Sequence, residues 1–144
     1  MLVRQILQGK SDDSVVTVKP GSLVSEAAKI LADKRIGTVV VSRDGNLPDG
    51  ILSERDIVRE LAVRGAGCLS ERVDGYMTSK LVTCALTDSA ESVMSRMTDG
   101  HFRHMPVIED GIMVGLISLG DVVKARLSEL AMEKDALEGM IMGH

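Results

Sequence analysis

Two stretches of the chain decide its fold, because they carry the same residue types at the same spacing. Residues 49–58 read DGILSERDIV, and residues 114–123 read VGLISLGDVV. Both contain the pattern Gly-x-x-Ser-x-x-Asp, and the second copy is one residue shorter in the turn that precedes it. Turns are where changes of length are tolerated. The self-similarity therefore predicts a supersecondary unit that occurs twice in one chain.

Each copy predicts the elements β-α-β-β-α in the same order. Apolar residues at three- to four-residue spacing indicate helices, and β-branched runs that end in Asp-Gly turns indicate strands. The expected elements are strands at 15–18 and 81–84, helices after the N-caps Ser22 and Asp88, strands at 38–41 and 105–108, strands at 50–52 and 115–117, and helices starting at Asp56 and Asp121.

A unit of about 60 residues is too small to bury both faces of its sheet, whereas two units packed sheet to sheet can do so. We therefore expect an α+β fold, in which two pseudo-symmetric repeats pack through their sheets with the helices outside. The expected boundaries are an N-terminal lead-in helix at 1–14, repeat 1 at 15–64, a linker at 65–80, repeat 2 at 81–126 and a C-terminal helical tail at 127–144.

The composition argues against several classes of partner. The chain has a net charge of −4, and its aromatic residues are Tyr76 and Phe102, so neither a basic footprint for nucleic acid nor a base-stacking surface is expected. The longest apolar runs fall short of a membrane span. Cys68 and Cys84 read as reduced, buried thiols of a cytoplasmic protein, with a disulfide or redox role as the alternative.

The paired signature, together with residues 102–107 (FRHMPV), resembles a tandem cystathionine-β-synthase (CBS) domain pair, or Bateman module. The match runs from about residue 15 to residue 126. The chain therefore also resembles small bacterial proteins that consist of a CBS pair and little else. The resemblance implies a regulatory sensor that binds an adenine nucleotide in the clefts between its halves. We expect no enzyme, because the sequence has no nucleophile-elbow or P-loop pattern and no supported Ser-His-Asp set. The candidate ligands are AMP, ADP and ATP, followed by NAD(H) and S-adenosylmethionine.

The residue types make this binding chemically intelligible. A carboxylate at a helix N-terminus is stabilised there and can accept hydrogen bonds from both hydroxyls of a ribose. By the family pattern, one cleft uses Asp121, Ser118, Arg103 and His104, with Met105 and Pro106 beside them and Val16, Ile36 and Gly37 as walls. The other cleft uses Asp56, Ser53, Gly37 and Thr38, walled by Thr78, Val82, Phe102 and Arg103. Arg55 and Lys124 are secondary candidates for contact with phosphate.

Plainer interpretations stay open for several of these residues. Asp56 and Asp121 can serve only as helix N-caps, Arg103 can form a surface ion pair, and Thr78 can merely end a turn. His104 can be a structural histidine, and with His101 it suits a metal only if that segment is helical. We expect no metal site.

The clefts differ in charge, because the first half has Gly37-Thr38 where the second has Arg103-His104. Phosphate favours charge-assisted donors, so the Asp121 cleft is the better candidate for a phosphate-bearing ligand.

A stripe of apolar residues on the C-terminal helix predicts a homodimer: Val123, Leu127, Leu130, Leu137 and Ile141. Alternative functions are a ligand-independent module that docks on an enzyme or transporter, and, less favoured, an enzyme acting on nucleotides. The regulated protein is unidentified.

Overall fold

The computed structural model describes residues 1–10 and 15–141. Residues 11–14 of the expected lead-in helix and 142–144 of the expected tail lie outside the described residues. The described chain mixes small sheets with helices and forms two compact units, so the α+β class is confirmed. The α3 unit comprises residues 15–82 and 110–114, and the α5 unit comprises residues 1–10, 83–109 and 115–141.

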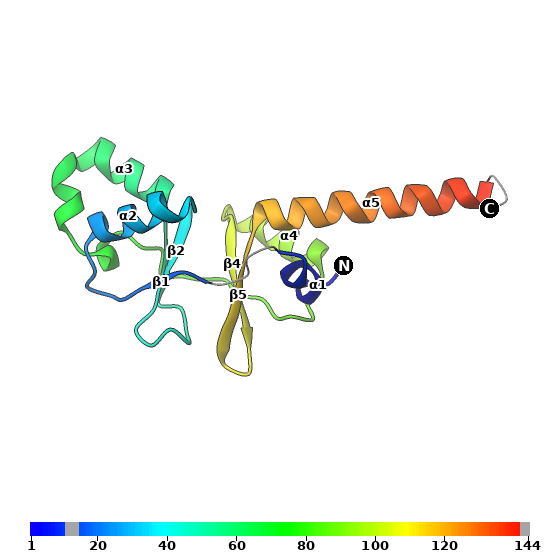
Figure 1. Cartoon of the computed structure of the whole chain (residues 1–144), viewed down its shortest axis with the longest axis horizontal. Coiled ribbons are helices and arrows are strands. Elements are labelled where there is room, and N and C mark those ends of the chain that lie inside the picture. Colours follow the sequence, from blue (N-terminus) through cyan, green and yellow to red (C-terminus); the bar gives the residue numbers. More distant parts are fainter. Residues whose placement is uncertain (11–14, 142–144) are drawn as a thin grey trace. The chain divides into compact units, whose positions relative to one another are not determined.

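The α3 unit is built on a three-stranded sheet in the order β1-β2-β3, with β1 parallel and β3 antiparallel to β2. The helices α2 and α3 pack beside each other and against this sheet (Figure 1). Valines at positions 39 and 41 and Leu52 are fully buried in its core. The elements are β1 (Thr17–Val18), α2 (Val24–Lys34), β2 (Thr38–Val41), β3 (Gly50–Ser53) and α3 (Glu54–Arg64).

Residues 65–80, expected as a linker, are packed onto the α3 unit. They contain two short 3-10 helices, η1 (Ala66–Ser70) and η2 (Val73–Gly75). Cys68 and Val73 are buried, and the N–H of Val24 donates to the carbonyl oxygen of Glu71 at 2.8 Å. This segment therefore supplies part of the core and part of the start of α2.

The α5 unit holds β4, the part of β5 from residue 115 onward and three helices, and α5 runs without interruption to the end of the described chain (Figure 1). Met105, Val107 and Ile117 are fully buried in its core. None of the described helices is long and apolar enough to cross a membrane. The elements are α1 (Val3–Gln8), α4 (Ala90–Gly100), β4 (His104–Glu109), β5 (Ile112–Ser118) and α5 (Leu119–Ile141).

The strand expected at 81–84 is wrong, because the structure has only a single parallel bridge there, between Cys84 and Val107. The N–H of Cys84 donates to the carbonyl oxygen of Pro106, and the N–H of Ile108 donates to that of Cys84. The next bond of such a ladder would need an N–H on Pro106, which proline lacks. The pairing therefore stops after one residue.

Two expected N-caps are wrong by one residue, and two expected helix starts are wrong by two residues. The structure has N-caps at Leu23 and Ser89 rather than at Ser22 and Asp88. The Asp88 carboxylate instead accepts from the N–H of Ala85 and pairs with Arg96. In the later helices, the first residues are Glu54 and Leu119 rather than Asp56 and Asp121.

The glycine of each signature is a site of close packing. A Cβ atom on Gly115 would lie 2.8 Å from Cδ1 of Leu7, and one on Gly50 would overlap the side chain of Met77. Leu7 and Met77 each precede a repeat in sequence. The absence of a side chain on each glycine therefore lets a segment from far along the chain pack against the strand.

We predict that Gly50→Ala and Gly115→Ala each lower the free energy of unfolding by about 1–3 kcal/mol, as overpacked cores do. Urea denaturation of each variant beside the wild type measures this. Gly67→Ala is the matched control, because a Cβ there has no heavy atom within 4 Å. Equal stability of Gly115→Ala and Gly67→Ala would contradict the packing role.

Candidate functional site

Each Ser-x-x-Asp motif forms a reciprocal hydrogen-bonded cap at a helix start. The backbone N–H of Ser53 donates to Oδ2 of Asp56 at 2.9 Å, and the N–H of Asp56 donates to Oγ of Ser53 at 3.2 Å. The corresponding distances for Ser118 and Asp121 are 2.9 and 3.1 Å. The serine is thus the capping residue, and the aspartate stands three residues later in the first turn.

A second hydrogen bond ties each helix start to the loop that precedes the first strand of the hairpin. The N–H of Glu54 donates to the carbonyl oxygen of Gly37 at 2.9 Å, and that of Leu119 donates to Arg103 at 2.8 Å. The residue at this position therefore lies beside the helix N-terminus in both units. One repeat has glycine there and the other has arginine.

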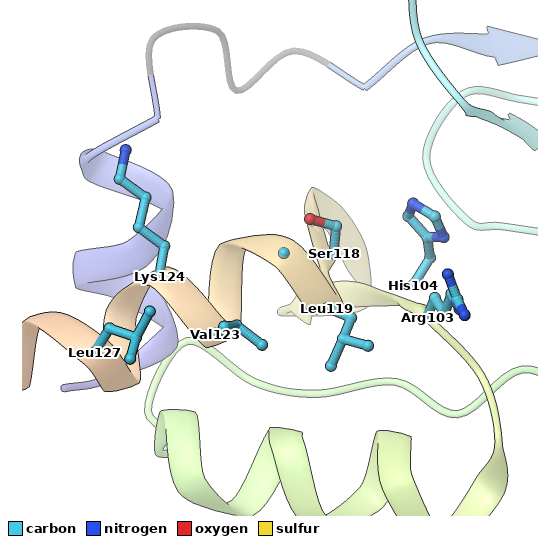
Figure 2. Close-up of a pocket in the computed structure, with 8 residues that line it drawn as sticks. Arg103, His104, Ser118, Leu119, Val123, Lys124 and Leu127 are labelled. Carbon is cyan, nitrogen blue, oxygen red and sulfur yellow. The ribbon is translucent and has the colours of Figure 1, made fainter.

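The start of α5 borders an open pocket of about 520 Å³, here called the α5 cavity, and every residue that lines it belongs to the α5 unit. Figure 2 shows three of its lining residues: Arg103 on the loop before β4, His104 at the start of β4 and Ser118 at the end of β5. Lys124 extends from α5 toward α1 (Figure 2) and also lines a neighbouring cavity of about 410 Å³. The lining residues are Arg103, His104, Ser118, Leu119, Gly120, Val123, Lys124 and Leu127.

Asp121 lies at the border of the neighbouring cavity, where Lys10 is its ion-pair partner. Nζ of Lys10 is 3.0 Å from Oδ2 of Asp121 and also donates to the carbonyl oxygen of Leu116 at 3.1 Å. Burial by itself raises the pKa of Asp121, but the hydrogen bonds from Ser118 and Lys10 and the charge of Lys10 outweigh it. The net pKa of Asp121 lies below its ordinary 3.8, so the carboxylate is charged at neutral pH.

His104 is half-buried, and burial lowers its pKa below the ordinary 6.5. The charge of Asp121 acts in the opposite direction, whereas Lys10 and Arg103 add to the lowering. At neutral pH the imidazole is therefore mainly neutral and interacts through its ring nitrogens as a hydrogen-bonding group.

The helix start in the α3 unit has a different charge pattern. Asp56 pairs with Arg59 at 3.4 Å, and that arginine is 67% exposed. The carboxylate of Glu54 lies beside Gly37, at the position that corresponds to Arg103. Because a carboxylate repels phosphate, this helix start is the poorer place for an anionic ligand.

The structure places the remaining expected site residues in one unit or the other. Met105 and Pro106 are buried in β4 of the α5 unit, and Phe102 packs against the same core. In the α3 unit, Thr38 pairs with Ser53 in the sheet and Thr78 bridges to Ile51. Val16, Ile36, Gly37, Thr78 and Val82 belong to the α3 unit, so their roles as walls beside Asp121 or Asp56 stay predictions.

Lys10 is the site residue that the motif analysis missed. It stands three residues after Leu7, as Lys80 stands three residues after Met77. Leu7 and Met77 pack on equivalent glycines. An alignment of the two segments that precede the repeats therefore pairs Lys10 with Lys80, and this pairing is the signal in the sequence that points to Lys10.

The expectation of buried thiols is confirmed, since Cys68 and Cys84 are both buried and free of disulfides. Burial raises the pKa of the Cys84 thiol to about 11, so little of the nucleophilic thiolate exists at neutral pH. Within residues 1–10 and 15–141, no group of three or more His, Cys, Asp or Glu side chains is placed to hold a metal ion.

Two copies of one α+β unit, each with a capped aspartate at a helix start, define a tandem-repeat module. The sequence profile of the CBS domain family matches residues 3–63 and 73–128. The chain therefore belongs to the CBS domain family, with the domain present as a pair.

Solved structures and curated relatives agree with this assignment. A CBS-domain-containing protein from Agrobacterium tumefaciens is 42% identical, with a TM-score of 0.81 over 88% of this chain and 99% of that one. The mitochondrial CBS domain-containing protein CBSX3 of Arabidopsis thaliana is 36% identical over 141 residues, which cover 94% of this chain and 68% of that protein.

The same fold occurs in the CBS domain pair of protein MJ0100, solved in complex with 5′-methylthioadenosine and S-adenosyl-L-methionine. Its TM-score is 0.77 over 90% of this chain and 98% of that one, at 22% identity.

We predict that protonation of His104 destabilises the fold. Because its folded pKa lies below 6.5, the unfolded chain binds this proton more tightly, and the unfolding free energy falls as pH drops from 6.5 through the folded pKa. Urea denaturation at pH 8 and pH 5 should show a larger loss for the wild type than for His104→Asn. An equal loss, or a His104 pKa above 6.5 by NMR titration, would contradict it.

Proposed function

We propose that the chain is a regulatory module that binds an adenine nucleotide at the start of α5. One observation carries this proposal: the α5 cavity brings together Ser118, Arg103, His104 and Lys124, with the capped carboxylate of Asp121 alongside. These groups match the two polar parts of a nucleotide. The candidate ligands are AMP, ADP and ATP, with NAD(H) and S-adenosylmethionine also carrying the adenosine moiety.

The cationic groups of the α5 cavity suit the phosphate end of a nucleotide. The guanidinium of Arg103 and the ammonium of Lys124 supply charge-assisted donors, and Arg103 suits bidentate contact with phosphate. Its backbone is held by the hydrogen bond from Leu119, so only the side chain has to be ordered. Ser118 and the neutral His104 add uncharged hydrogen-bonding groups.

The sugar end is best served by Asp121, whose carboxylate can accept from both ribose hydroxyls. The α5 cavity is also lined by Gly120 and by the apolar residues Leu119, Val123 and Leu127. Leu119, which is not part of the apolar stripe on α5, suits the apolar face of a base. The adenosine-containing ligands of the MJ0100 pair support an adenosine moiety here, whereas the nature of the group attached to it rests on the cations of this chain.

We assign the module a regulatory rather than a catalytic role. Regulation requires that the ligand bind one conformation of the module better than another. The regulated protein would then read the difference in conformation.

Isothermal titration calorimetry with adenosine, AMP, ADP and ATP tests the proposal. We predict that Asp121→Ala weakens all four ligands by about 10- to 100-fold, because it removes the acceptor for the ribose hydroxyls. Asp56→Ala is the matched control, since Asp56 forms the same cap in the other unit. Wild-type protein that ignores all four ligands would contradict the proposal, and equal affinities for wild type and Asp121→Ala would remove Asp121 from the site.

Arg103→Ala separates the phosphate from the sugar. We predict that it weakens AMP and ATP by about tenfold or more and leaves adenosine nearly unchanged, because only the phosphate gains from the guanidinium. The same calorimetric series measures this. A uniform loss across adenosine, AMP and ATP would show that Arg103 acts on the fold and not on phosphate.

We also propose that the module is a homodimer that pairs through α5. The stripe residues Leu127, Leu130, Leu137 and Ile141 are exposed by 50–84%. With Val123 they recur at alternating four- and three-residue steps, interrupted by Lys134, which is the spacing of helices that pair.

We predict that Leu130→Glu combined with Leu137→Glu converts a dimer into a monomer, because it places charge in the apolar seam. Light scattering at micromolar concentration gives the mass directly. Met132→Glu is the matched control, since Met132 is equally exposed but lies on the opposite face of the helix. A monomeric wild type would overturn the dimer.

A further inference from the structure

The carboxylate assigned to the ribose hydroxyls already has a cationic partner from a distant part of the chain. Nζ of Lys10 lies 3.0 Å from Oδ2 of Asp121, and the two side chains are only 26% and 22% exposed. Such a half-buried pair is less screened by water and salt than a surface pair. The lysine is also held by its hydrogen bond to the carbonyl oxygen of Leu116.

The position of Lys10 follows from packing rather than from chance contact. Leu7 fills the space left by the missing side chain of Gly115, and Gly9 ends α1 with its N–H bonded to the carbonyl oxygen of Gln5. Lys10 comes directly after this turn. Met77 packs on Gly50 in the same way, and Lys80 stands three residues after it. The side chain of Lys80, however, is exposed.

The two aspartates therefore differ in their counter-ions, although their caps are the same. Asp56 pairs with the exposed Arg59 of its own helix at 3.4 Å, whereas Asp121 pairs with a half-buried lysine from another element. Lys10 and Lys124 line one cavity together with Asp121, and Lys124 also lines the cavity of Arg103. The negative charge of Asp121 is thus balanced next to the place where phosphate is expected.

We propose that Lys10 is a positioning residue that sets the ligand preference of the site formed by Asp121 and the α5 cavity. Its ammonium group orients and neutralises the carboxylate of Asp121, so that the site favours a ribose ligand carrying phosphate over the neutral nucleoside. This inference rests on the proposed function and deepens it. Without the ammonium group, a half-buried negative charge stands beside the phosphate position and repels it.

Calorimetry with AMP and adenosine as the probes tests the role of Lys10. Lys10→Met should lower the preference for AMP over adenosine by roughly tenfold, while adenosine itself binds as well as before or better, because Asp121 loses a competing donor. Lys10→Arg should restore the preference, because it restores the charge. Arg4→Met is the matched control, since Arg4 is an exposed cation on α1, the short helix that precedes Lys10.

An NMR titration of the Asp121 carboxyl supplies a readout that a purely structural role would not move. Its pKa should rise in Lys10→Met and stay low in Lys10→Arg and Arg4→Met, because Lys10 contributes both a hydrogen bond and a charge that lower it. If Lys10→Met does not fold, Lys10→Gln replaces it in both measurements.

The outcomes separate the two proposals. Wild-type protein that binds neither AMP nor adenosine overturns the proposed function and the role of Lys10 with it. Wild-type protein that prefers AMP, together with a Lys10→Met variant that keeps the same preference, overturns the role of Lys10 alone. A preference lost equally in Lys10→Met and Arg4→Met also overturns it, because general charge then explains the effect.

Discussion

The hydrogen bonds between the capping serine and the aspartate of each signature are the constraint on which both candidate sites depend. They satisfy donors that a helix start leaves unpaired, and they fix the carboxylate of Asp56 or Asp121 in the first turn. The next N–H in the chain bonds to the carbonyl oxygen of Gly37 or Arg103. A short motif thus brings a strand end, a helix start and the loop before another strand to one place, whatever side chain that loop carries.

Features whose cause is local could be predicted from the sequence. The run of β-branched residues at 38–41 forms a strand with those bounds, and the serine and aspartate of each motif do come together. Features that depend on remote partners could not. The strand expected at 81–84 stops at Cys84 because Pro106 cannot extend the ladder, and α2 starts after Leu23 because Glu71 accepts from Val24.

The same distinction explains which residues of the candidate site could be predicted from the sequence. Arg103, His104 and Ser118 lie close to the motif in sequence or pair with it through the hairpin, so the repeat alignment suffices to group them. Lys10 reaches Asp121 only because Leu7 packs on Gly115. That contact depends on how closely a side chain from another segment packs on a glycine. The residues of the motif do not indicate it, and only a comparison of the segments before each repeat does. Residues 65–80 show the same effect, since Cys68 and Val73 are core residues in a stretch that looks like a linker.

Comparison of the two repeats separates what the fold needs from what the proposed ligand would need. Both repeats have the glycine on which a side chain from another segment packs, and both have the serine–aspartate cap. We expect changes at these residues to lower the free energy of unfolding most. The charges around the caps differ. Arg103 occupies the position that corresponds to Gly37, and Asp121 pairs with the half-buried Lys10, whereas Asp56 pairs with the exposed Arg59. Since charges near the surface usually contribute less to stability than core packing does, the charges can change in one unit while the architecture of both stays the same. The cationic surroundings of Asp121 are therefore not a requirement of the helix start, and they are the surroundings that the proposed phosphate-bearing ligand would need.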